Sequence, residues 1–322
     1  MMQKKINLVL GTMTFGEQIF GEDVNVMIES FLSKGYSDID TAYVYNNGEC
    51  ERLLGAALVD IERKNYRIDT KVNPRIKGKL DKSAVLDQAN ESLKRLHIKS
   101  IDTLYLHFPD PNTPIEYALE GCAQLYEERK FKKLGLSNFP AWLVGEVHNI
   151  CDKHGWMLPK VYEGLYNPLS RNAERELNRA LDYYDMCFYA YNPLAGGILT
   201  DKYSGKNKTL KDGRFINRPN YQQRYWKDSY FEAADRIKRV CGKYNMDIVE
   251  ATYRWLAYHS MLNGDRGDAI IIGASRLSQL ETNMTTLENG ELPEEVLSVI
   301  EEAWKICKAD APEYFKYYET TK

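Results

Sequence analysis

Cysteine is sparse in this sequence of 322 residues, and its pattern excludes two classes of small-domain architecture. The six cysteines are widely scattered, with no CxxC pair and no cluster of cysteine and histidine at metal-ligand spacing. Neither a disulfide framework nor a zinc site is therefore indicated. We expect free thiols in a reducing compartment, which predicts a cytoplasmic location, and we expect no metal site.

Long apolar runs and an excess of positive charge are also missing. No stretch approaches the length that spans a bilayer, and the mean hydropathy is −0.52. The apolar segment before Gly11 is too short for a secretory signal. The net charge is −3, so the sequence provides no basic field for nucleic acid. We expect a soluble protein that binds neither a membrane nor nucleic acid.

A third absence concerns dinucleotide motifs. No G-x-G-x-x-G follows the first apolar segment, and apolar character does not divide into two halves, which argues against a doubly wound sheet. The chain instead has eight short apolar segments, separated by amphipathic helical patterns. They cover residues 6–12, 36–42, 66–72, 101–108, 131–138, 160–166, 186–193 and 269–275. This alternation predicts an α/β fold, a parallel (β/α)8 TIM barrel, as a single domain over residues 1–322.

The interval between the seventh and eighth segments is unusually long, at about 75 residues. It contains a polar stretch that is rich in aromatic and positively charged side chains. Long loops in compact domains are usually functional or disordered. The aromatic residues argue against plain disorder, so we predict a functional loop between strands seven and eight.

Four polar residues lie where consecutive predicted strands end. Asp40 ends the second strand, Lys71 the third and His107 the fourth, while Tyr45 follows Asp40 in the next loop. In a (β/α)8 barrel the chemistry lies at the carboxyl ends of the strands. Taken singly, Asp40 could be a turn former, Lys71 a charge reaching solvent and His107 a core histidine. Four such residues at neighbouring strand ends favour a common site.

The four residue types suit one kind of chemistry. A lysine after apolar residues needs a partner, and Asp40 on the neighbouring strand could pair with Lys71. A lysine beside the Tyr45 hydroxyl would favour the phenolate and lower its pKa from about 10. A neutral His107 could donate a hydrogen bond to a carbonyl oxygen. Together they would deliver a proton to a carbonyl group that receives a hydride.

Several motifs occur in an order that resembles a known family. DIDTAYVYNNGE, IDTKV, DTLYLHFPD and GLSNF together resemble the aldo-keto reductases, from LGTMTFG at residues 10–16 almost to the end of the chain. YNPLAGGILTDKY, GRF, RYW and GASRLSQLETN are similar to the subfamily of aflatoxin-aldehyde and succinic-semialdehyde reductases. The resemblance implies a barrel that uses NADPH to reduce aldehydes to alcohols, including semialdehydes, dicarbonyls and aryl aldehydes.

The resemblance also implies residue roles. Tyr45 would be the general acid, Lys71 would lower its pKa, Asp40 would hold Lys71, and His107 would orient the carbonyl. Ser137 and Asn138 would contact the nicotinamide carboxamide. The residues implied along the rest of NADPH are Tyr191 under the nicotinamide ring, Asn192, Leu194, Gly196 and Gly197 at the pyrophosphate, and Ser275, Arg276, Gln279 and Asn283 at the 2′-phosphate and adenine.

The last of these positions has a physical basis of its own. A strand that leads into a helix start presents free N–H groups and a favourable dipole to an anion. Arg276 adds a fork of donors that suits a phosphate. The same residues are equally compatible with an ordinary helix start that carries an exposed arginine and binds no phosphate.

Two departures from the family pattern bear on function. The family commonly has glutamine where this chain has Glu163, so the cofactor contact of Glu163 depends on whether it is protonated or turned away. Relatives bind a substrate carboxylate with two arginines, one of which matches Arg224. Lys316 stands near the place of the other and would act as a point charge without bidentate geometry. We expect Arg224 and Lys316 to bind the substrate; singly, each would fit a solvated surface charge.

A second function is compatible with the same residues. The potassium-channel β subunits share this barrel and bind NADPH as regulatory proteins, and they keep the set Asp40, Tyr45, Lys71 and His107. The alternative is therefore an NADPH-binding regulatory subunit with little turnover. Relatives often form homodimers, although no residue of this chain indicates one.

Overall fold

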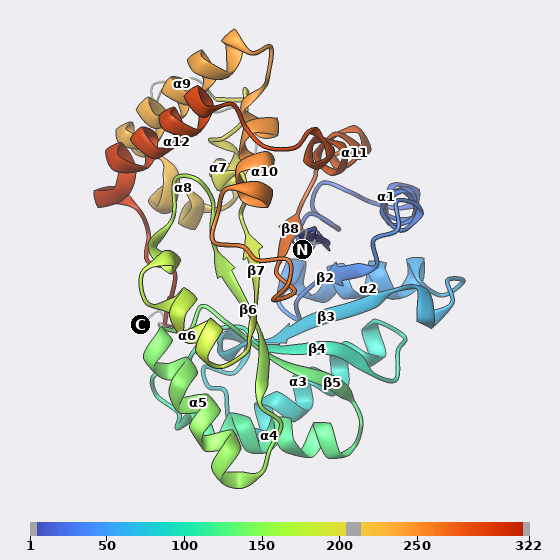
Figure 1. The fold of residues 1–322 in the computed structure, drawn as a ribbon. Helices are drawn as coiled ribbons and strands as arrows, with labels where there is room; N and C mark the ends of the chain where they lie inside the picture. The colour runs from blue at the N-terminus through green and yellow to red at the C-terminus, as the bar shows by residue number, and fades with distance from the viewer. Residues whose placement is uncertain (1–4, 204–213, 318–322) are drawn as a thin grey trace.

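The computed structural model describes residues 5–203 and 214–317, and its centre is a closed barrel of eight strands in sequence order. Every neighbouring pair is parallel, including β8 with β1 (Figure 1). The strands are β1 Asn7–Gly11, β2 Asp38–Asp40, β3 Arg67–Val72, β4 Ile101–Leu106, β5 Phe131–Ser137, β6 Pro159–Leu165, β7 Cys187–Tyr191 and β8 Ala269–Ile272. The predicted (β/α)8 barrel is confirmed, and each predicted strand segment overlaps one of these strands.

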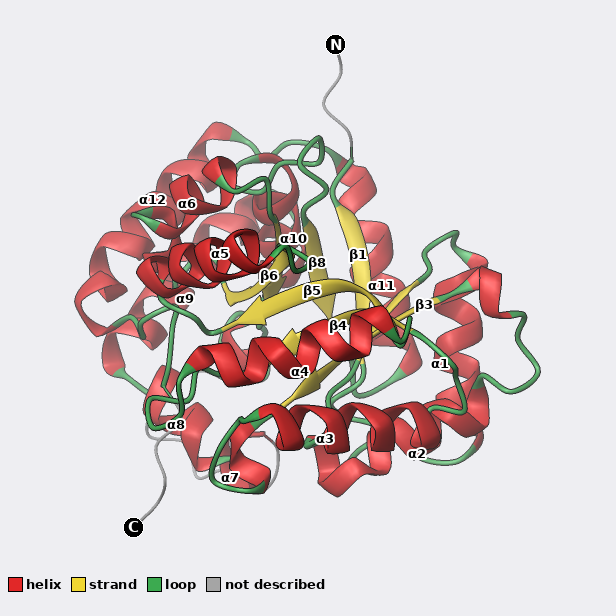
Figure 2. Ribbon diagram, turned by 90° about the horizontal axis from the view of Figure 1, so that it is seen from below, coloured by secondary structure: helices red, strands yellow, loops and turns green. Residues whose placement is uncertain are grey.

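The helices surround the strands (Figure 2). They are α1 Glu22–Ser33, α2 Glu49–Ala57, α3 Lys82–Arg95, α4 Ile115–Glu127, α5 Ala141–His154, α6 Leu177–Tyr183, α7 Arg214–Asn217, α8 Pro219–Tyr225, α9 Asp228–Lys243, α10 Ile248–Tyr258, α11 Leu277–Thr286 and α12 Glu294–Cys307. Local sequence fixes some of their ends: the Asp81 carboxylate accepts a hydrogen bond from the Ala84 N–H at 2.9 Å and caps α3. Among the described residues, none of the helices has the length and apolar character that crossing a membrane requires.

The interior of the barrel has layers because side chains alternate along each strand. A small apolar cluster fills it, made of Val9, Tyr105, Val161, Tyr189, Ala269 and Ile271. Glycine makes room for the largest of these side chains, since a Cβ at Gly135 would lie 2.3 Å from the Tyr105 ring. Residues two positions further along the strands form the next layer, where Lys71, His107 and Tyr191 lie.

The long interval after β7 is largely helical. Its described part forms the short helices η5 Ala195–Gly197, α7 and α8, followed by α9 and α10. Residues 204–213, within the predicted functional loop, lie outside the described residues. Helix α12 lies alongside α9, so the last helix packs on this part of the chain (Figure 1).

Candidate active site

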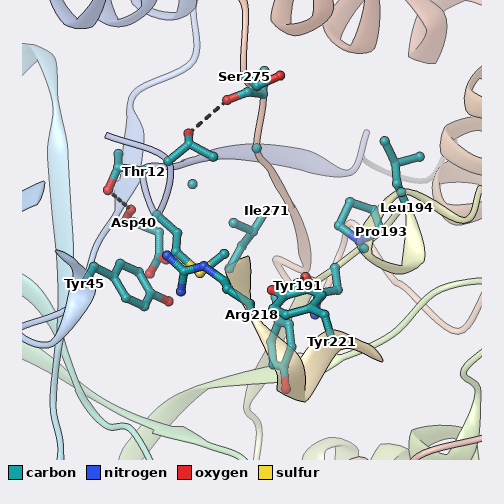
Figure 3. A pocket seen from close by; sticks show the side chains of 18 of the residues that line it. Thr12, Asp40, Tyr45, Tyr191, Pro193, Leu194, Arg218, Tyr221, Ile271 and Ser275 are labelled. Carbon is teal, nitrogen blue, oxygen red and sulfur yellow. Dashed lines mark hydrogen bonds between the residues drawn. The ribbon is translucent and has the colours of Figure 1, made fainter. Parts of the chain in front are cut away.

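A cavity of about 1030 Å³ opens at the carboxyl ends of the strands. Figure 3 shows Tyr45 and Asp40 on one side, Tyr191 and Tyr221 on the other, and Arg218 between them. Most of the residues that the sequence singled out line this cavity: Asp40, Tyr45, His107, Ser137, Asn138, Glu163, Tyr191, Asn192, Leu194, Gly196, Gly197, Arg224, Ser275, Arg276, Gln279 and Asn283. Lys71 lies directly beneath it, within the barrel.

Lys71 is fully buried and surrounded by oxygen atoms. Its Nζ is paired with Asp40 Oδ1, donates a hydrogen bond to the Thr41 carbonyl at 2.9 Å, and lies 3.1 Å from Glu163 Oε2. Burial opposes the charged form of Lys71, but Asp40 and Glu163 outweigh burial and raise its pKa. The lysine therefore carries a positive charge below the cavity in the resting protein.

Glu163 faces this lysine from β6 and is not turned away. The register of β5 and β6 places it opposite Ser137. Burial, reinforced by the nearby Asp40, raises the pKa of Glu163 well above its usual range, and Lys71 opposes this effect. A neutral carboxyl at this position is the form that the surroundings favour.

Tyr45 lies at the cavity wall in η1 Tyr45–Gly48. The centroid of its ring is 5.5 Å from Lys71 Nζ and 6.0 Å from the His107 ring, which it meets edge-on. The expected fall in the pKa of Tyr45 is wrong for this structure: burial raises the pKa well above 10, and the opposing charge of Lys71 is too weak to reverse that. The hydroxyl therefore keeps its proton.

Asn73 determines which nitrogen of His107 carries hydrogen. The Asn73 Oδ1 accepts the Arg75 N–H at 2.9 Å, so its Nδ2, 3.0 Å from His107 Nδ1, is the donor of that pair. His107 Nδ1 must then accept, which leaves the hydrogen on Nε2. Burial, together with Lys71 and Arg75, lowers the pKa of His107 well below its usual value, so the ring is neutral.

Gln88 of α3 fixes the position of Asn73 by hydrogen bonds to its backbone. Its Oε1 accepts the Asn73 N–H at 2.8 Å, and its Nε2 donates to the Asn73 carbonyl at 3.1 Å. The backbone of Asn73 is thus clamped by one buried amide, while its side chain orients His107.

Asn138 connects the β4 end with β7. Its Nδ2 donates to the His107 carbonyl and to Ser137 Oγ, each at 3.0 Å, and its Oδ1 accepts from the Tyr191 hydroxyl at 2.7 Å. The positive φ of Asn138, 62°, turns the chain at this point. These contacts fix the Tyr191 ring along one side of the cavity.

The far end of the cavity is built by β8 and α11. Arg276 is the residue before the first turn of α11, and its backbone is extended. The Gln279 Oε1 accepts from both the Ser275 N–H at 3.1 Å and the Ser275 hydroxyl at 2.9 Å. A helix N-terminus and an arginine therefore meet at one place that would suit an anion.

A family model described as aldo/keto reductase matches residues 7–305. The chain belongs to this family. The resemblance inferred from the motifs is confirmed, and the protein is an oxidoreductase.

Individual members of the family are similar to this chain over most of its length. Aflatoxin B1 aldehyde reductase member 2 of Rattus norvegicus is 40% identical over 319 residues, which cover 96% of this chain and 87% of the relative. Aldo-keto reductase family 7 member A3 of Homo sapiens is 39% identical over 319 residues, covering 96% of both chains. Aldo-keto reductase pigE of Monascus ruber is 34% identical over 310 residues, covering 91% of this chain and 90% of the relative.

The two basic residues expected at the substrate have different positions in this aldo-keto reductase. Arg224 of α8 lines the cavity, contacts Tyr191 and lies 5.9 Å from the centroid of the Tyr221 ring. The Lys316 side chain is exposed and is not part of the cavity wall, whereas its backbone N–H donates to the Asn138 carbonyl at 3.0 Å. The structure therefore brings Arg224 to the site but not the Lys316 ammonium group.

Sequence reasoning missed several residues that line the cavity of the reductase: Thr12, Asn73, Arg75, Arg218, Tyr221 and Ile271. Asn73 could have been identified from the sequence, because it follows Lys71 at a strand end and precedes a proline. No sequence pattern indicates Arg218 and Tyr221, since their position depends on how the segment after β7 returns to the barrel. Among the described residues, no group of His, Cys, Asp or Glu is placed to hold a metal ion.

Proposed function

We propose that this protein reduces aldehydes to alcohols with NADPH, and that Tyr45 is the proton donor. The observation that carries the proposal is the convergence of Tyr45, buried Lys71 and a neutral His107 at one end of a cavity whose other end is a helix start with Arg276. The names of the relatives from rat and human, which are aldehyde reductases or aldo-keto reductases, support the same reaction.

Three parts of the cavity wall support the binding of a dinucleotide. Tyr191 offers an aromatic face for a nicotinamide ring beside the amide of Asn138. Gly196 and Gly197 have positive φ values of 69° and 110°, which glycine adopts without strain, and both line the part of the cavity where a pyrophosphate would lie. Ser275 and Arg276 at the start of α11 would hold the 2′-phosphate.

NADPH, when bound, supplies the hydride to the carbonyl carbon. The His107 Nε2–H would donate a hydrogen bond to the carbonyl oxygen and orient it. The Tyr45 hydroxyl would transfer its proton to that oxygen as negative charge develops. Lys71 would stabilise the phenolate that remains, and Asp40 would hold Lys71 in place.

Substrates that carry a carboxylate fit the charge of the cavity wall. Arg224 is half-buried, and its five N–H donors suit a carboxylate. Because Lys316 lies outside the cavity wall, we assign the carboxylate to Arg224 alone. Small semialdehydes and 2-carboxybenzaldehyde are the first substrates to test, followed by dicarbonyls and simple aryl aldehydes.

The deciding experiment is a panel of these aldehydes with NADPH and NADH measured side by side at 340 nm. Turnover of at least one carboxylate-bearing aldehyde, with NADPH preferred, is the expected result. Tight NADPH binding without turnover of any aldehyde would instead favour the regulatory NADPH-binding subunit.

The cofactor preference gives a residue-level prediction. Arg276→Ala should weaken NADPH binding about 10-fold or more while changing NADH binding little, because only NADPH carries the 2′-phosphate. Fluorescence titration with both cofactors measures this difference. Arg236→Ala, on the exposed surface of α9, is the matched control, and an equal loss for NADPH and NADH would contradict the assignment.

A further inference from the structure

Three ionisable side chains meet at the floor of the cavity, and their charges would not balance if all three were ionised. Lys71 provides one positive charge, while Asp40 and Glu163 provide two carboxyl groups. The side-chain exposures are 0% for Lys71 and 4% for each carboxyl, so water does not compensate the imbalance. A buried carboxylate without a partner is strongly unfavourable, which favours one retained proton on this pair.

The geometry indicates which carboxyl holds the proton. Asp40 makes the closer contact with Lys71 Nζ, whereas Glu163 Oε2 is 3.1 Å away. The nearby Asp40 also raises the pKa of Glu163, which adds to the effect of burial. Asp40 accepts a hydrogen bond from Lys71 and is stabilised as the carboxylate, whereas the buried Oε2 of Glu163 has no hydrogen-bond partner within the described part of the chain, which favours the neutral form of Glu163.

Among the residues that the structure describes, the other titratable groups facing Glu163 add no second cation. Tyr45, Tyr105 and Tyr191 face it from η1, β4 and β7, and burial raises the pKa of each phenol. Its neighbour on β5 is the uncharged Ser137. His107 is neutral, and Asp69 lies one layer deeper on β3 with its pKa raised to about 8 by burial and by Asp38.

We propose that Glu163 is the proton store of this active site: it holds one proton in the resting protein and gives it up, through Lys71, to reload Tyr45 as positive charge forms on the nicotinamide. This inference rests on the proposed function. It assigns a role to the residue at which the chain departs from the glutamine that is common in the family, since a glutamine has no proton to give.

The steps balance in atoms and charge. The Tyr45 O–H bond breaks as its proton joins the carbonyl oxygen, a Lys71 N–H proton restores the Tyr45 hydroxyl, and the Glu163 O–H proton restores the Lys71 ammonium. The electron pair that forms the new C–H bond arrives with the hydride. Glu163 would gain one negative charge as one positive charge forms on the nicotinamide, so the net charge of the site would be unchanged.

Conservation of charge is the physical advantage of this arrangement. Glu163 lines the cavity wall that would hold the nicotinamide, beside Ser137, Asn138 and Tyr191. In a site shielded from water, opposite charges that appear together stabilise each other more than they would in solvent. The same coupling predicts that the oxidised cofactor, which carries the positive charge, displaces the proton of Glu163 on binding, whereas the reduced cofactor does not.

Proton release on cofactor binding tests this directly and needs no turnover. Calorimetric titrations at pH 7 in buffers of different ionisation enthalpy give the number of protons released with NADP+ and with NADPH. We expect roughly one more proton released with NADP+ than with NADPH. Glu163→Gln should abolish this difference, and Asp69→Asn, which removes the deeper buried carboxyl, should keep it.

Infrared spectroscopy supplies a readout that identifies the group. The C=O band of a neutral carboxyl should disappear in the difference spectrum when NADP+ binds, and Glu163→Gln should remove this change while Asp69→Asn leaves it. If Glu163→Gln fails to fold, Glu163→Asp should keep proton release but shift its pH midpoint, because the shorter side chain lies farther from Lys71.

Three results would overturn the proposal. They are an equal proton count for NADP+ and NADPH in the native chain, a difference that persists in Glu163→Gln, and a carboxyl band that NADP+ leaves unchanged. Failure of the proposed function would look different: no aldehyde would be reduced, although the proton difference and the carboxyl band could both be present.

Discussion

At the scale of single residues, Asn73 has the most specific effect, because it decides the tautomer of His107. Its amide cannot be reversed without losing the Arg75 N–H bond at 2.9 Å, and Gln88 fixes its backbone from the other side. His107 is thereby kept as a donor through Nε2, the form that a carbonyl oxygen requires.

Replacing Asn73 by aspartate should reverse this polarity. The new carboxylate would accept from the histidine Nδ1–H, leave Nε2 without its hydrogen, and reduce kcat by about 100-fold at neutral pH. A nearby carboxylate also raises the pKa of His107, so activity should partly recover as pH falls and the ring becomes a double donor. Nitrogen NMR of the histidine tautomer, together with the pH profile of kcat, measures both effects.

Asn112→Asp makes the same chemical change at an exposed position outside the cavity wall, and it should alter neither measurement. A His107 tautomer that is unchanged in Asn73→Asp would show that Asn73 has only a structural role.

Single residues also show which parts of the site could be predicted from the sequence. Asp40, Lys71, Tyr45 and His107 were predicted to share a site because strand ends in a barrel meet at one rim. Asn73 was passed over although it lies two residues after Lys71, since its importance depends on partners from α3 and from the turn that follows. The raised pKa of Tyr45 could not be predicted either, because burial is a property of the folded chain.

At the scale of elements, the segment before α8 is tied to two loops on the opposite side of the cavity. Arg218 is paired with Glu17 of the β1–α1 loop, and its Nη2 lies 3.3 Å from Asn46 Oδ1 in η1. Asn46 is itself held by its Nδ2, which donates to the Phe15 carbonyl at 2.7 Å. Arg218 lines the cavity (Figure 3), so this connection restrains that part of the cavity wall.

Breaking the Arg218–Glu17 pair should speed the escape of bound cofactor. Glu17→Gln removes one partly buried ion pair, and we expect the rate of NADPH dissociation to rise about 5-fold with little change in the association rate. Stopped-flow displacement of NADPH, followed by its fluorescence, measures both rates. Glu232→Gln breaks an exposed pair on α9 and serves as the control; an unchanged dissociation rate in Glu17→Gln would refute the restraint.

The elements themselves were predictable to different degrees. The strands were found because each is a short apolar segment with polar residues at its end, and the helices between them were expected from their amphipathic patterns. Helix α8 was missed because PNYQQRY has no apolar period of its own. Its inward tyrosines, Tyr221 and Tyr225, are buried only where the chain returns to β7.

At the scale of the whole molecule, the closed barrel brings charges together that no local pattern connects. Glu163 and Lys71 lie on β6 and β3, which are not neighbours in the barrel, yet their charged atoms are 3.1 Å apart across its interior. The sequence showed that Glu163 departs from the family pattern but could not show its distance from Lys71.

The buried Asp69 should make the stability of the barrel depend on pH. Its pKa rises from 3.8 to about 8 on folding because burial and Asp38 disfavour the carboxylate. A raised folded-state pKa gives a stabilising contribution that is complete below pH 3.8 and is lost as pH rises through about 8. In the native chain the unfolding free energy should therefore fall as pH rises toward 8. Asp69→Asn should make this slope shallower, by up to about 1.4 kcal/mol per pH unit.

Urea unfolding of both proteins from pH 5 upward gives this slope. The exposed Asp60 provides the control, because Asp60→Asn should leave the pH dependence as it is. If the unfolding free energies of Asp69→Asn and the native chain vary with pH in parallel, the neutral form assigned to Asp69 is contradicted.

The central claim is that the Tyr45 hydroxyl protonates a carbonyl reduced by NADPH, and Tyr45→Phe tests it most directly. The neighbouring Tyr43→Phe is a matched control, because Tyr43 packs against Arg95 outside the cavity wall. NADPH affinity by fluorescence titration and the single-turnover rate with 2-carboxybenzaldehyde are measured on the same samples. We predict that Tyr45→Phe binds NADPH within about 2-fold of the native chain but loses at least about 100-fold in rate. A rate within a few-fold of the native value would contradict the account.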